Sequence, residues 1–416
     1  MIYDEIKNNF KNYNEFVLPD YNGYNFANIN NTLLNLFNVN YNGYKLDNKL
    51  YENLKGNNKI IFIYIDGLGY NHWINYLSNY KPFKTINENG IVSPITAVFP
   101  STTAAASNTI NTGLYPIEHG LFEWRLFIEK YNMVLKSLPF IPVYKEDKKR
   151  FNDINPDPEI LFNGKTFYET LKENGIKSYI ISNSNLLKSD YSKIMYSGAK
   201  EKKRFDFLCE GFMILKKVID KLKDNSYVFF YIENFDKMEH RYGPGSQEHL
   251  NSIKYISYLF DDLFKEIYGR DVSVIISSDH GFSKVDKKIY VNNIDKYLKE
   301  FNGKKIPETW SPRDMMLYLN DEDSAITYLK DMLNDSAEIM KTDYLLKNNL
   351  LGYGKLKEEY KSRLGNVLIL PKNGNTVWYK YYENDIIKDN GMHGGLSSEE
   401  MVIPFSALNL KDIKNY

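Results

Sequence analysis

Residues 60–69 read IIFIYIDGLG, an unbroken apolar run that ends in an acidic residue and a glycine-rich turn. A run of this length, rich in β-branched and aromatic side chains, is typical of a strand buried on both faces of a sheet. Similar short runs recur at 92–98, 178–182, 227–232, 272–277 and 401–408. Amphipathic helical patterns at 165–175, 211–224 and 248–269 lie between several of them. This alternation predicts an α/β fold with a central, mostly parallel sheet and helices on both of its faces.

The remaining residues predict two additions to this sheet. Residues 1–57 are polar and rich in Asn and Tyr, and we expect them to form an N-terminal extension packed on the core. Residues 286–390 are more charged, interrupt the strand–helix alternation and contain a hairpin-like stretch at 367–382. We expect a smaller inserted cap region there, which sets specificity. The catalytic α/β core then comprises residues 58–285 and 391–416.

Composition excludes several classes of protein. The 416 residues contain 53 Lys and Arg against 53 Asp and Glu, and a chain without net charge has no general attraction for nucleic-acid polymers or anionic membranes. The single thiol, Cys209, permits no internal disulfide, and its apolar surroundings predict that it is buried. The N-terminus lacks a signal-peptide pattern, and no apolar run approaches the roughly 20 residues of a membrane span. We therefore expect a soluble, cytoplasmic protein.

Potential metal ligands follow the predicted strands. In open α/β sheets, functional groups gather beyond the carboxyl ends of the strands. Three strands here are followed by Asp or His, and a further His lies among glycines near the C-terminus. These residues are Asp66, Asp236, His240, Asp279, His280 and His393. Each motif alone has a plain alternative, such as a helix-capping Asp, a solvated helix pair, a polar turn or a flexible loop.

The six residues together predict a metal centre. Three Asp and three His suit two zinc-like divalent ions, although the same ligands also accept Mn or Fe. The other three histidines, His72, His119 and His249, have no acidic partner at metal-binding spacing along the chain. We expect those three to be structural, with His119 in a turn beside the site.

A candidate nucleophile lies at Thr103. The segment TAVFPSTTAAASNTINTG runs from a strand through a turn into a small-residue helix that ends at Gly113. At the first turn of that helix, the backbone N–H groups and the helix dipole favour a phosphate or an alkoxide. Alternatively, Ser101 and Thr102 or Thr103 merely cap the helix. A threonine hydroxyl is a poor nucleophile unless a metal lowers its pKa, so the nucleophile and the metal centre require one another.

The order of these motifs resembles the alkaline phosphatase superfamily and, within it, the type I phosphodiesterase/nucleotide pyrophosphatase family. The motifs are Asp66, PSTT with TGLYPIEHG, D-x-x-x-H-x-x-G-P, SDHG and HGG, and they span most of the chain in family order. The resemblance implies an alkaline-phosphatase-like fold. It also implies two metal sites: one zinc on Asp66, Asp279, His280 and the Thr103 oxygen, and the other on Asp236, His240 and His393.

The implied reaction is hydrolysis of a phosphodiester or pyrophosphate bond in a small, nucleotide-type phosphate ester. Threonine would attack phosphorus to give a covalent phosphothreonine, which water then hydrolyses. Alternatives are a phosphomonoesterase or phosphonate hydrolase on the same scaffold, or a metal-stabilised binding module without turnover. Sulfatases are disfavoured because their C-x-P-x-R nucleophile motif is absent.

Substrate recognition departs from the family pattern. Relatives often place an Asn four residues after the HG motif, where this chain has Trp124. Either Glu123, Trp124 or Arg125 reshapes the substrate pocket, or Trp124 simply packs. In the insertion, we expect Arg313 to be a surface ion-pair residue rather than a substrate ligand.

Overall fold

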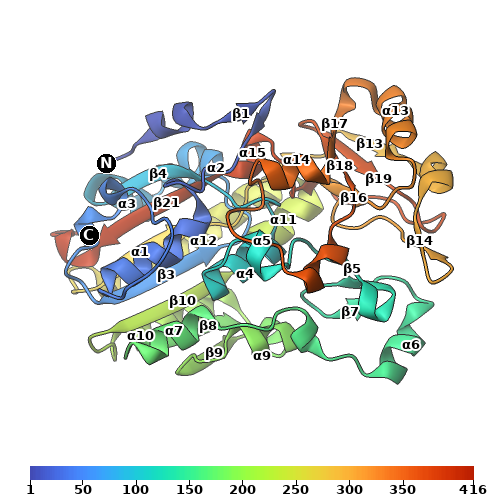
Figure 1. The fold of residues 1–416 in the computed structure, drawn as a ribbon. Coiled ribbons are helices and arrows are strands. Elements are labelled where there is room, and N and C mark those ends of the chain that lie inside the picture. Colours follow the sequence, from blue (N-terminus) through green and yellow to red (C-terminus); the bar gives the residue numbers. More distant parts are fainter.

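A seven-stranded sheet forms the centre of the molecule, in a computed structural model that describes residues 1–416 (Figure 1). Its strand order is β4-β21-β11-β3-β10-β8-β9. The strands are β3 (Lys59–Ile65), β4 (Ile91–Thr96), β8 (Lys177–Asn183), β9 (Glu201–Phe205), β10 (Ser226–Ile232), β11 (Ser273–Ser277) and β21 (Val402–Asn409). Five neighbouring strands, β11 to β9, pair in parallel, whereas β21 runs antiparallel between β11 and β4. The mostly parallel central sheet predicted from the sequence is therefore confirmed.

Helices cover both faces of this sheet. Alternate side chains of a strand point to opposite faces, and β3 follows this rule. Phe62 and Tyr64 enter a core shared with α1, α4 and α7, whereas Ile61 and Ile63 enter a core shared with α3, α10 and α12. The helices on the first face are α1 (Ile29–Leu36), α4 (Thr103–Thr112) and α7 (Phe167–Glu173), and those on the second are α3 (Lys81–Asn89), α10 (Leu208–Ile219) and α12 (Gln247–Ile267).

The shorter elements connect these layers. The short helices are α2 (Tyr70–Asn75), α5 (Pro116–His119), α8 (Ser184–Leu187), α9 (Asp190–Met195), α11 (Asn234–Tyr242) and α15 (Ser398–Met401). Three two-stranded ladders are formed by β1 (Asn12–Tyr13) with β2 (Phe16–Val17), β12 (Ser283–Lys284) with β20 (Gly391–Met392), and β14 (Glu300–Phe301) with β15 (Lys304–Lys305).

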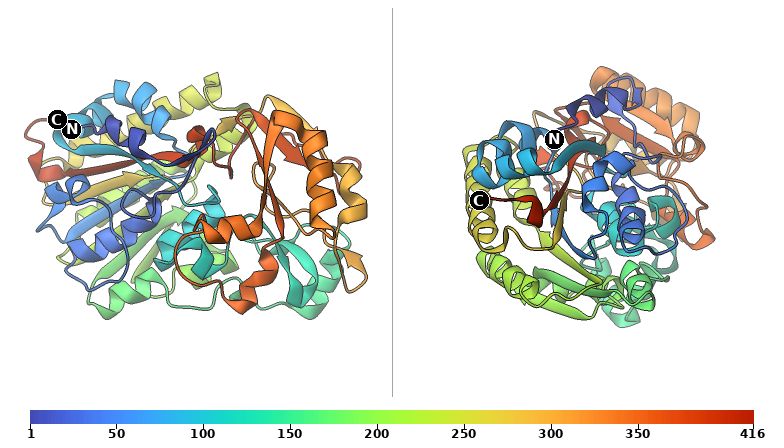
Figure 2. Two further views of the ribbon diagram at one scale, coloured as in Figure 1. Left: turned by 45° about the horizontal axis from the view of Figure 1, so that its top comes forward. Right: turned by 90° about the vertical axis from the view of Figure 1, so that its left-hand side faces the viewer.

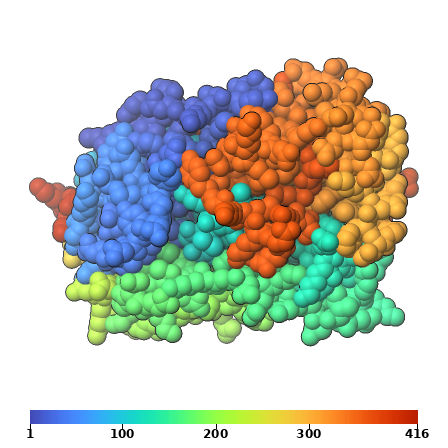
Figure 3. All heavy atoms as spheres, in the orientation of Figure 1, coloured from blue at the N-terminus to red at the C-terminus, as the bar shows by residue number.

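The N-terminal residues lie along the β4 edge of the sheet. Tyr3 N–H donates to Val92 O at 2.9 Å, and Thr96 N–H donates to Tyr24 O at 2.7 Å. In the space-filling view these residues (blue) meet the orange residues after 300 across one face of the molecule (Figure 3). The side chain of Asn14 donates to Glu338 Oε1 at 3.1 Å at this junction.

Besides the β14–β15 ladder, residues 286–390 contain two small sheets of their own. Parallel strands β13 (Lys287–Tyr290) and β19 (Asn375–Trp378) form one, and β16 (Met315–Leu317), β18 (Val367–Pro371) and β17 (Ala337–Lys341) form the other, with α13 (Glu322–Leu333) and α14 (Thr342–Lys347) beside them. The hairpin expected at 367–382 is wrong. Strand β18 pairs with β16 and β17, whereas β19 pairs with β13, because the turn after β18 carries the chain from one sheet to the other.

A second segment lies beside this region (Figure 2). Strands β5 (Arg125–Ile128), β6 (Met133–Lys136) and β7 (Ile141–Pro142) form an antiparallel sheet outside the central one, followed by α6 (Asp147–Ile154). Phe127 packs on Tyr318, with ring centroids 5.7 Å apart, and Lys304 forms an ion pair with Asp147 at 3.1 Å. Two stretches far apart in the sequence therefore pack together beyond one end of the central sheet.

Two further features bear on the expectations from sequence. Cys209 is exposed, so its predicted burial is wrong; it occupies the second position of α10 and faces away from the core that Leu208 enters. None of the helices has both the length and the apolar character that a membrane crossing requires.

Candidate active site

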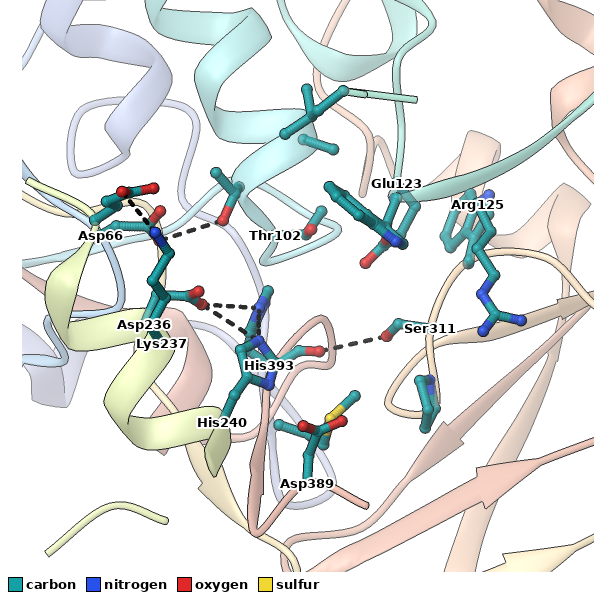
Figure 4. A pocket seen from close by; sticks show the side chains of 18 of the residues that line it. Asp66, Thr102, Glu123, Arg125, Asp236, Lys237, His240, Ser311, Asp389 and His393 are labelled. Atoms are coloured by element: carbon teal, nitrogen blue, oxygen red, sulfur yellow. Dashed lines mark hydrogen bonds and ion pairs between the residues drawn. The ribbon is translucent and has the colours of Figure 1, made fainter. Parts of the chain in front are cut away.

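The predicted ligands converge beyond one end of the central sheet. Strands β3, β10 and β11 lie side by side and in parallel, so the residues that follow them meet at one edge. Asp66 follows β3 directly, Asp236 lies in α11 after β10, and Asp279 follows β11. His393 reaches the same place from the loop after β20. A cavity of about 610 Å³ opens here (Figure 4).

The first cluster consists of Asp66, Asp279 and His280, all buried. His280 Nε2 lies 3.5 Å from Asp66 Oδ1 and 3.3 Å from Asp279 Oδ2. Backbone N–H groups of Gly67 and His280 donate to Asp279 Oδ1 at 3.0 Å, which leaves Oδ2 free to face the cluster. Tyr231 holds the other oxygen of Asp66 through its hydroxyl.

The second cluster consists of Asp236, His240 and His393. Asp236 Oδ1 lies 3.3 Å from His240 Nε2 and 3.5 Å from His393 Nε2, and the two Nε2 atoms are 3.1 Å apart. The His280 ring stacks on the His393 ring with centroids 3.5 Å apart, so the two clusters are adjacent. The six ligands predicted from sequence thus lie in two neighbouring groups.

All three imidazoles of these clusters present a lone pair. Each ring places Nδ1 at 3.1 Å from a backbone carbonyl: His240 on Gly391, His280 on Gly281 and His393 on Ser101. A carbonyl oxygen can only accept, so each neutral ring has its hydrogen on Nδ1 and leaves Nε2 without one. This arrangement of an outer carbonyl and an inward lone pair is typical of metal-binding histidine.

The charges of the clusters also fit divalent cations. Asp236 Oδ1 and Asp279 Oδ2 are buried without a hydrogen-bond partner. Burial raises the pKa of Asp66, and the nearby carboxylates of Asp279 and Asp236 raise it further. Three carboxylates and three lone pairs facing a common space repel one another unless cations lie between them. The residues present therefore fit the metal pair that the resemblance implied.

Thr103 faces the first cluster from the start of α4. Its Oγ1 lies 3.2 Å from Asp66 Oδ1 and 3.2 Å from His280 Nε2. Thr102 is the N-cap residue of α4, and no side-chain hydrogen bond caps this helix. The Thr103 hydroxyl therefore does not cap the helix; it contacts Asp66 and His280 instead. The small buried residues that follow it, such as Ala105, let the helix lie close to the sheet.

The residues after the HG motif line the same cavity. Glu123, Trp124 and Arg125 all face it, and Trp124 is 39% exposed, so this ring forms pocket wall rather than core. Burial raises the pKa of Glu123 to about 7. The Arg125 guanidinium lies 4.4 Å from the ring centroid of Trp378 and pairs with the buried Glu308 at 3.2 Å.

Two expectations from sequence are wrong. Arg313 is fully buried rather than exposed, and its guanidinium pairs with Glu400 at 2.6 Å. His72 and His249 do have an acidic partner, because Glu239 Oε1 lies 3.4 Å from each of them. Spacing along the chain could not reveal that group, since its three members come from three different helices. His119 is buried and bonds to Asn108 and Thr109, as a structural histidine does.

The known proteins similar in sequence to this chain are distant relatives, and their names describe phosphodiesterases. Human ectonucleotide pyrophosphatase/phosphodiesterase family member 1 is 28% identical over 223 residues, which is 50% of this chain and 22% of that protein. Venom phosphodiesterase 2 of Crotalus adamanteus is 23% identical over 279 residues, 62% of this chain and 32% of that protein. The matched part of this chain thus spans a third or less of the length of these relatives.

Solved structures show the same fold. Human ectonucleotide pyrophosphatase/phosphodiesterase 5 superposes on this chain with a TM-score of 0.64 at 15% sequence identity. The superposition covers 84% of this chain and 87% of the human chain. The murine counterpart, solved as an inactive threonine-to-alanine variant in complex with AMP, superposes with a TM-score of 0.62 at 16% identity over the same shares.

The family assignment follows from a match over most of the chain. The family model described as "Type I phosphodiesterase / nucleotide pyrophosphatase" matches residues 60–396, which include all the clustered ligands and Thr103. This protein belongs to the type I phosphodiesterase/nucleotide pyrophosphatase family of the alkaline phosphatase superfamily.

Proposed function

We propose that this protein is a two-zinc hydrolase that cleaves a phosphodiester or pyrophosphate bond in a nucleotide-type small molecule, with Thr103 as the nucleophile. The observation that carries the proposal is the position of the Thr103 hydroxyl. It lies 3.2 Å from a carboxylate and 3.2 Å from an imidazole lone pair of the first cluster, at the N-terminus of a ten-residue helix. A hydroxyl so placed can be activated and can face a phosphate at the same time.

The metal ligands follow from the two clusters. Asp66, Asp279 and His280 with the Thr103 oxygen would hold one ion, and Asp236, His240 and His393 would hold the other. When bound, a pair of divalent cations lowers the pKa of a ligated hydroxyl and stabilises negative charge on phosphate oxygens. The mixture of imidazole and carboxylate favours zinc, with manganese or iron as the other choices.

The residues of the chain then perform two displacements. Thr103 Oγ1 gives up its proton to solvent and forms a bond to phosphorus while the bond from phosphorus to the leaving group breaks, which gives a phosphothreonine. The leaving-group oxygen takes up a proton from water. The hydroxyl hydrogen points at Asp66 Oδ1 before attack, so this carboxylate orients the nucleophile. Water then cleaves the bond between phosphorus and Thr103 and restores the hydroxyl. Backbone N–H groups at the start of α4 stabilise the charged oxygens in both steps.

The charges around the pocket support a diester rather than a monoester. A monoester carries a second negative charge and needs an additional cation. The two cationic side chains that line the pocket are already paired, Arg125 with Glu308 at 3.2 Å and Lys237 with Glu233 at 2.5 Å. The aromatic walls further suit a flat organic group such as a nucleobase. The AMP complex of the murine relative supports a nucleotide-type ligand, because AMP carries such a base.

Hydrolysis of two chromogenic esters tests the proposal. The purified, zinc-loaded chain is assayed with bis-p-nitrophenyl phosphate and with p-nitrophenyl phosphate under identical conditions. We expect the diester to be cleaved at least about tenfold faster in kcat/KM, an energy difference of about 1.4 kcal/mol. A clear preference for the monoester would instead support the phosphomonoesterase alternative. Bound zinc without turnover of these esters or of nucleotide diesters would support the binding module.

A further inference from the structure

A third cluster of ligand-type side chains lies outside the active site. It consists of His72 of α2, Glu239 of α11 and His249 of α12, and all three are buried. The three helices pack on the same face of the sheet (Figure 1). None of these residues has a part in the mechanism proposed above.

The distances in the third cluster are those of metal ligands. Glu239 Oε1 lies 3.4 Å from His72 Nδ1 and 3.4 Å from His249 Nε2. A good hydrogen bond between such groups is about 2.7–2.9 Å long, so both contacts are too long for one. Two ligands about 2.0–2.1 Å from a tetrahedral zinc are about 3.3–3.4 Å apart. The first and second clusters have the same separations, from 3.1 to 3.5 Å.

The polar atoms that face one another in this cluster have no hydrogen-bond partner. Both carboxylate oxygens of Glu239 are buried without a hydrogen bond, as are His72 Nδ1 and His249 Nε2. Burying a carboxylate in this way is costly unless a cation or donors compensate its charge. Burial also lowers the pKa of His72 to about 3 and that of His249 to about 4, so both rings are neutral at pH 7.

We propose that His72, Glu239 and His249 bind a third divalent cation, with zinc as the ion best suited to two imidazoles and one carboxylate. His72 would bind through Nδ1, His249 through Nε2, and Glu239 through one or both oxygens. A cavity of about 250 Å³ lined by His72, Asn71 and Pro244 adjoins the cluster and gives an ion a path from solvent.

Binding would change the hydrogen on His249. Gly245 N–H donates to His249 Nδ1 at 3.0 Å, so a neutral ring in this arrangement has its hydrogen on Nε2. Zinc binding at Nε2 releases that proton, and Nδ1 takes one up, so the ring stays neutral. The bond from Gly245 then breaks, and the turn that precedes α12 adjusts.

The third cluster would hold the active site in position without taking part in the reaction. Glu239 lies between Asp236 and His240 in α11, and these two neighbours belong to the second cluster. An ion on Glu239 would tie α11 to α12 and to α2, which begins shortly after Asp66. Three helices around the active site would be cross-linked at one point.

Zinc content tests this inference directly. The full chain is loaded with zinc and freed of excess metal, and its zinc content per chain is measured by elemental mass spectrometry. We expect about three zinc ions per wild-type chain and about two in Glu239→Gln. Glu248→Gln makes the same chemical change at an exposed position beside His249 and should retain three. Equal zinc content in wild type and Glu239→Gln would overturn the inference.

A variant without the active-site clusters separates this inference from the proposed function. His280→Ala with His393→Ala removes a ligand from each of those clusters and leaves the third intact. We expect this double variant to retain about one zinc ion, which is lost when Glu239→Gln is added. Retention of no zinc in the double variant would contradict the third site while leaving the proposed function untouched.

Thermal unfolding gives an independent test, because the two possibilities predict different changes in the Tm of Glu239→Gln. If Glu239 binds zinc, Glu239→Gln lowers Tm in zinc, and the difference from wild type disappears after chelation. If Glu239 is a buried carboxylate without a cation, the neutral amide should leave Tm unchanged or raise it in both conditions. The second result would refute the site even if the zinc content were ambiguous.

Discussion

The Nε2 atoms of His240 and His393 lie 3.1 Å apart, and two neutral rings with their hydrogens on Nδ1 have none to place between them. Each ring uses its hydrogen on Nδ1 to bond a backbone carbonyl, Gly391 O for His240 and Ser101 O for His393. Two lone pairs at this distance repel, and Asp236 adds a negative charge beside them. A cation among these atoms turns the repulsion into coordination.

Removal of metal should therefore abolish activity and destabilise the fold. We expect chelation to reduce kcat against a phosphodiester on the order of a thousandfold and to lower Tm. Added zinc should restore both. The measurement is an assay and a thermal melt of the same sample before chelation, after it and after zinc is returned. Full activity in a sample shown to be free of metal would contradict a metal-dependent mechanism.

Replacement of the nucleophile separates chemistry from metal binding. We predict that Thr103→Ala loses turnover on the order of a thousandfold or more. Only the Thr103 hydroxyl bonds to both Asp66 and His280, whereas the Tyr231 hydroxyl bonds to Asp66 alone. The fold and the zinc content should remain. Rates, zinc content and circular dichroism of the purified variant check the three parts of this prediction.

Thr103→Ser is the matched control for this variant. Serine keeps a hydroxyl at the same position, so it should retain measurable turnover and form a covalent phosphoryl adduct detectable by mass spectrometry in an acid-quenched reaction. Undiminished turnover in Thr103→Ala would exclude this residue as the nucleophile.

The sequence predicted the sheet and the six clustered ligands because both depend on local patterns. Continuous apolar runs identify buried strands, and ligands that directly follow parallel strands must meet at one edge. Asp66 and Asp279 illustrate this, since each comes within two residues of a strand end. Their roles as zinc ligands, like that of Thr103, stay predictions that the experiments above examine.

Pairings between distant segments could not be predicted in this way. Glu239 joins His72 and His249 across three helices, and Arg313 reaches Glu400 from a segment that sequence alone assigns to the surface. The expected hairpin failed for the same reason, because strands β18 and β19 satisfy their hydrogen bonds with strands far away in the sequence.

Trp124 offers a test of substrate class. Its partly exposed ring lines the cavity. Stacking of a base on an aromatic ring contributes about 1–3 kcal/mol to binding. Trp124→Ala should therefore lower kcat/KM about 5- to 150-fold for a nucleoside p-nitrophenyl ester. Methyl p-nitrophenyl phosphate has the same leaving group but no base, so its kcat/KM should change little.

The conservative control at this position is Trp124→Phe, which keeps an aromatic face and should retain most of the preference for the nucleoside ester. Equal losses for both esters in Trp124→Ala would show that the ring shapes the site as a whole and does not recognise a base.

The ion pair between Arg313 and Glu400 should dominate the stability of the loop that carries His393. Both side chains are fully buried, and Glu400 also accepts a hydrogen bond from Gly395 N–H at 3.0 Å. Removal of one member of a buried pair leaves the other charge uncompensated, so Arg313→Met should lower the free energy of unfolding by about 3–5 kcal/mol. Denaturant unfolding of the single variants and of Arg313→Met with Glu400→Gln checks this, since the double variant should lose less than the sum of the singles.

The same pair predicts how stability depends on pH. Burial alone would raise the pKa of Glu400, but the guanidinium of Arg313 more than offsets this and holds the pKa below its ordinary value. A carboxyl whose pKa is lower in the folded state stabilises the protein above its unfolded pKa, about 4.3, and loses that contribution as pH falls through the folded value. The stability gap between wild type and Glu400→Gln should thus be full at pH 7 and narrow below about pH 4. A gap that stays constant from pH 7 to pH 3 would show that Glu400 acts through packing and its backbone hydrogen bonds, and not through its charge.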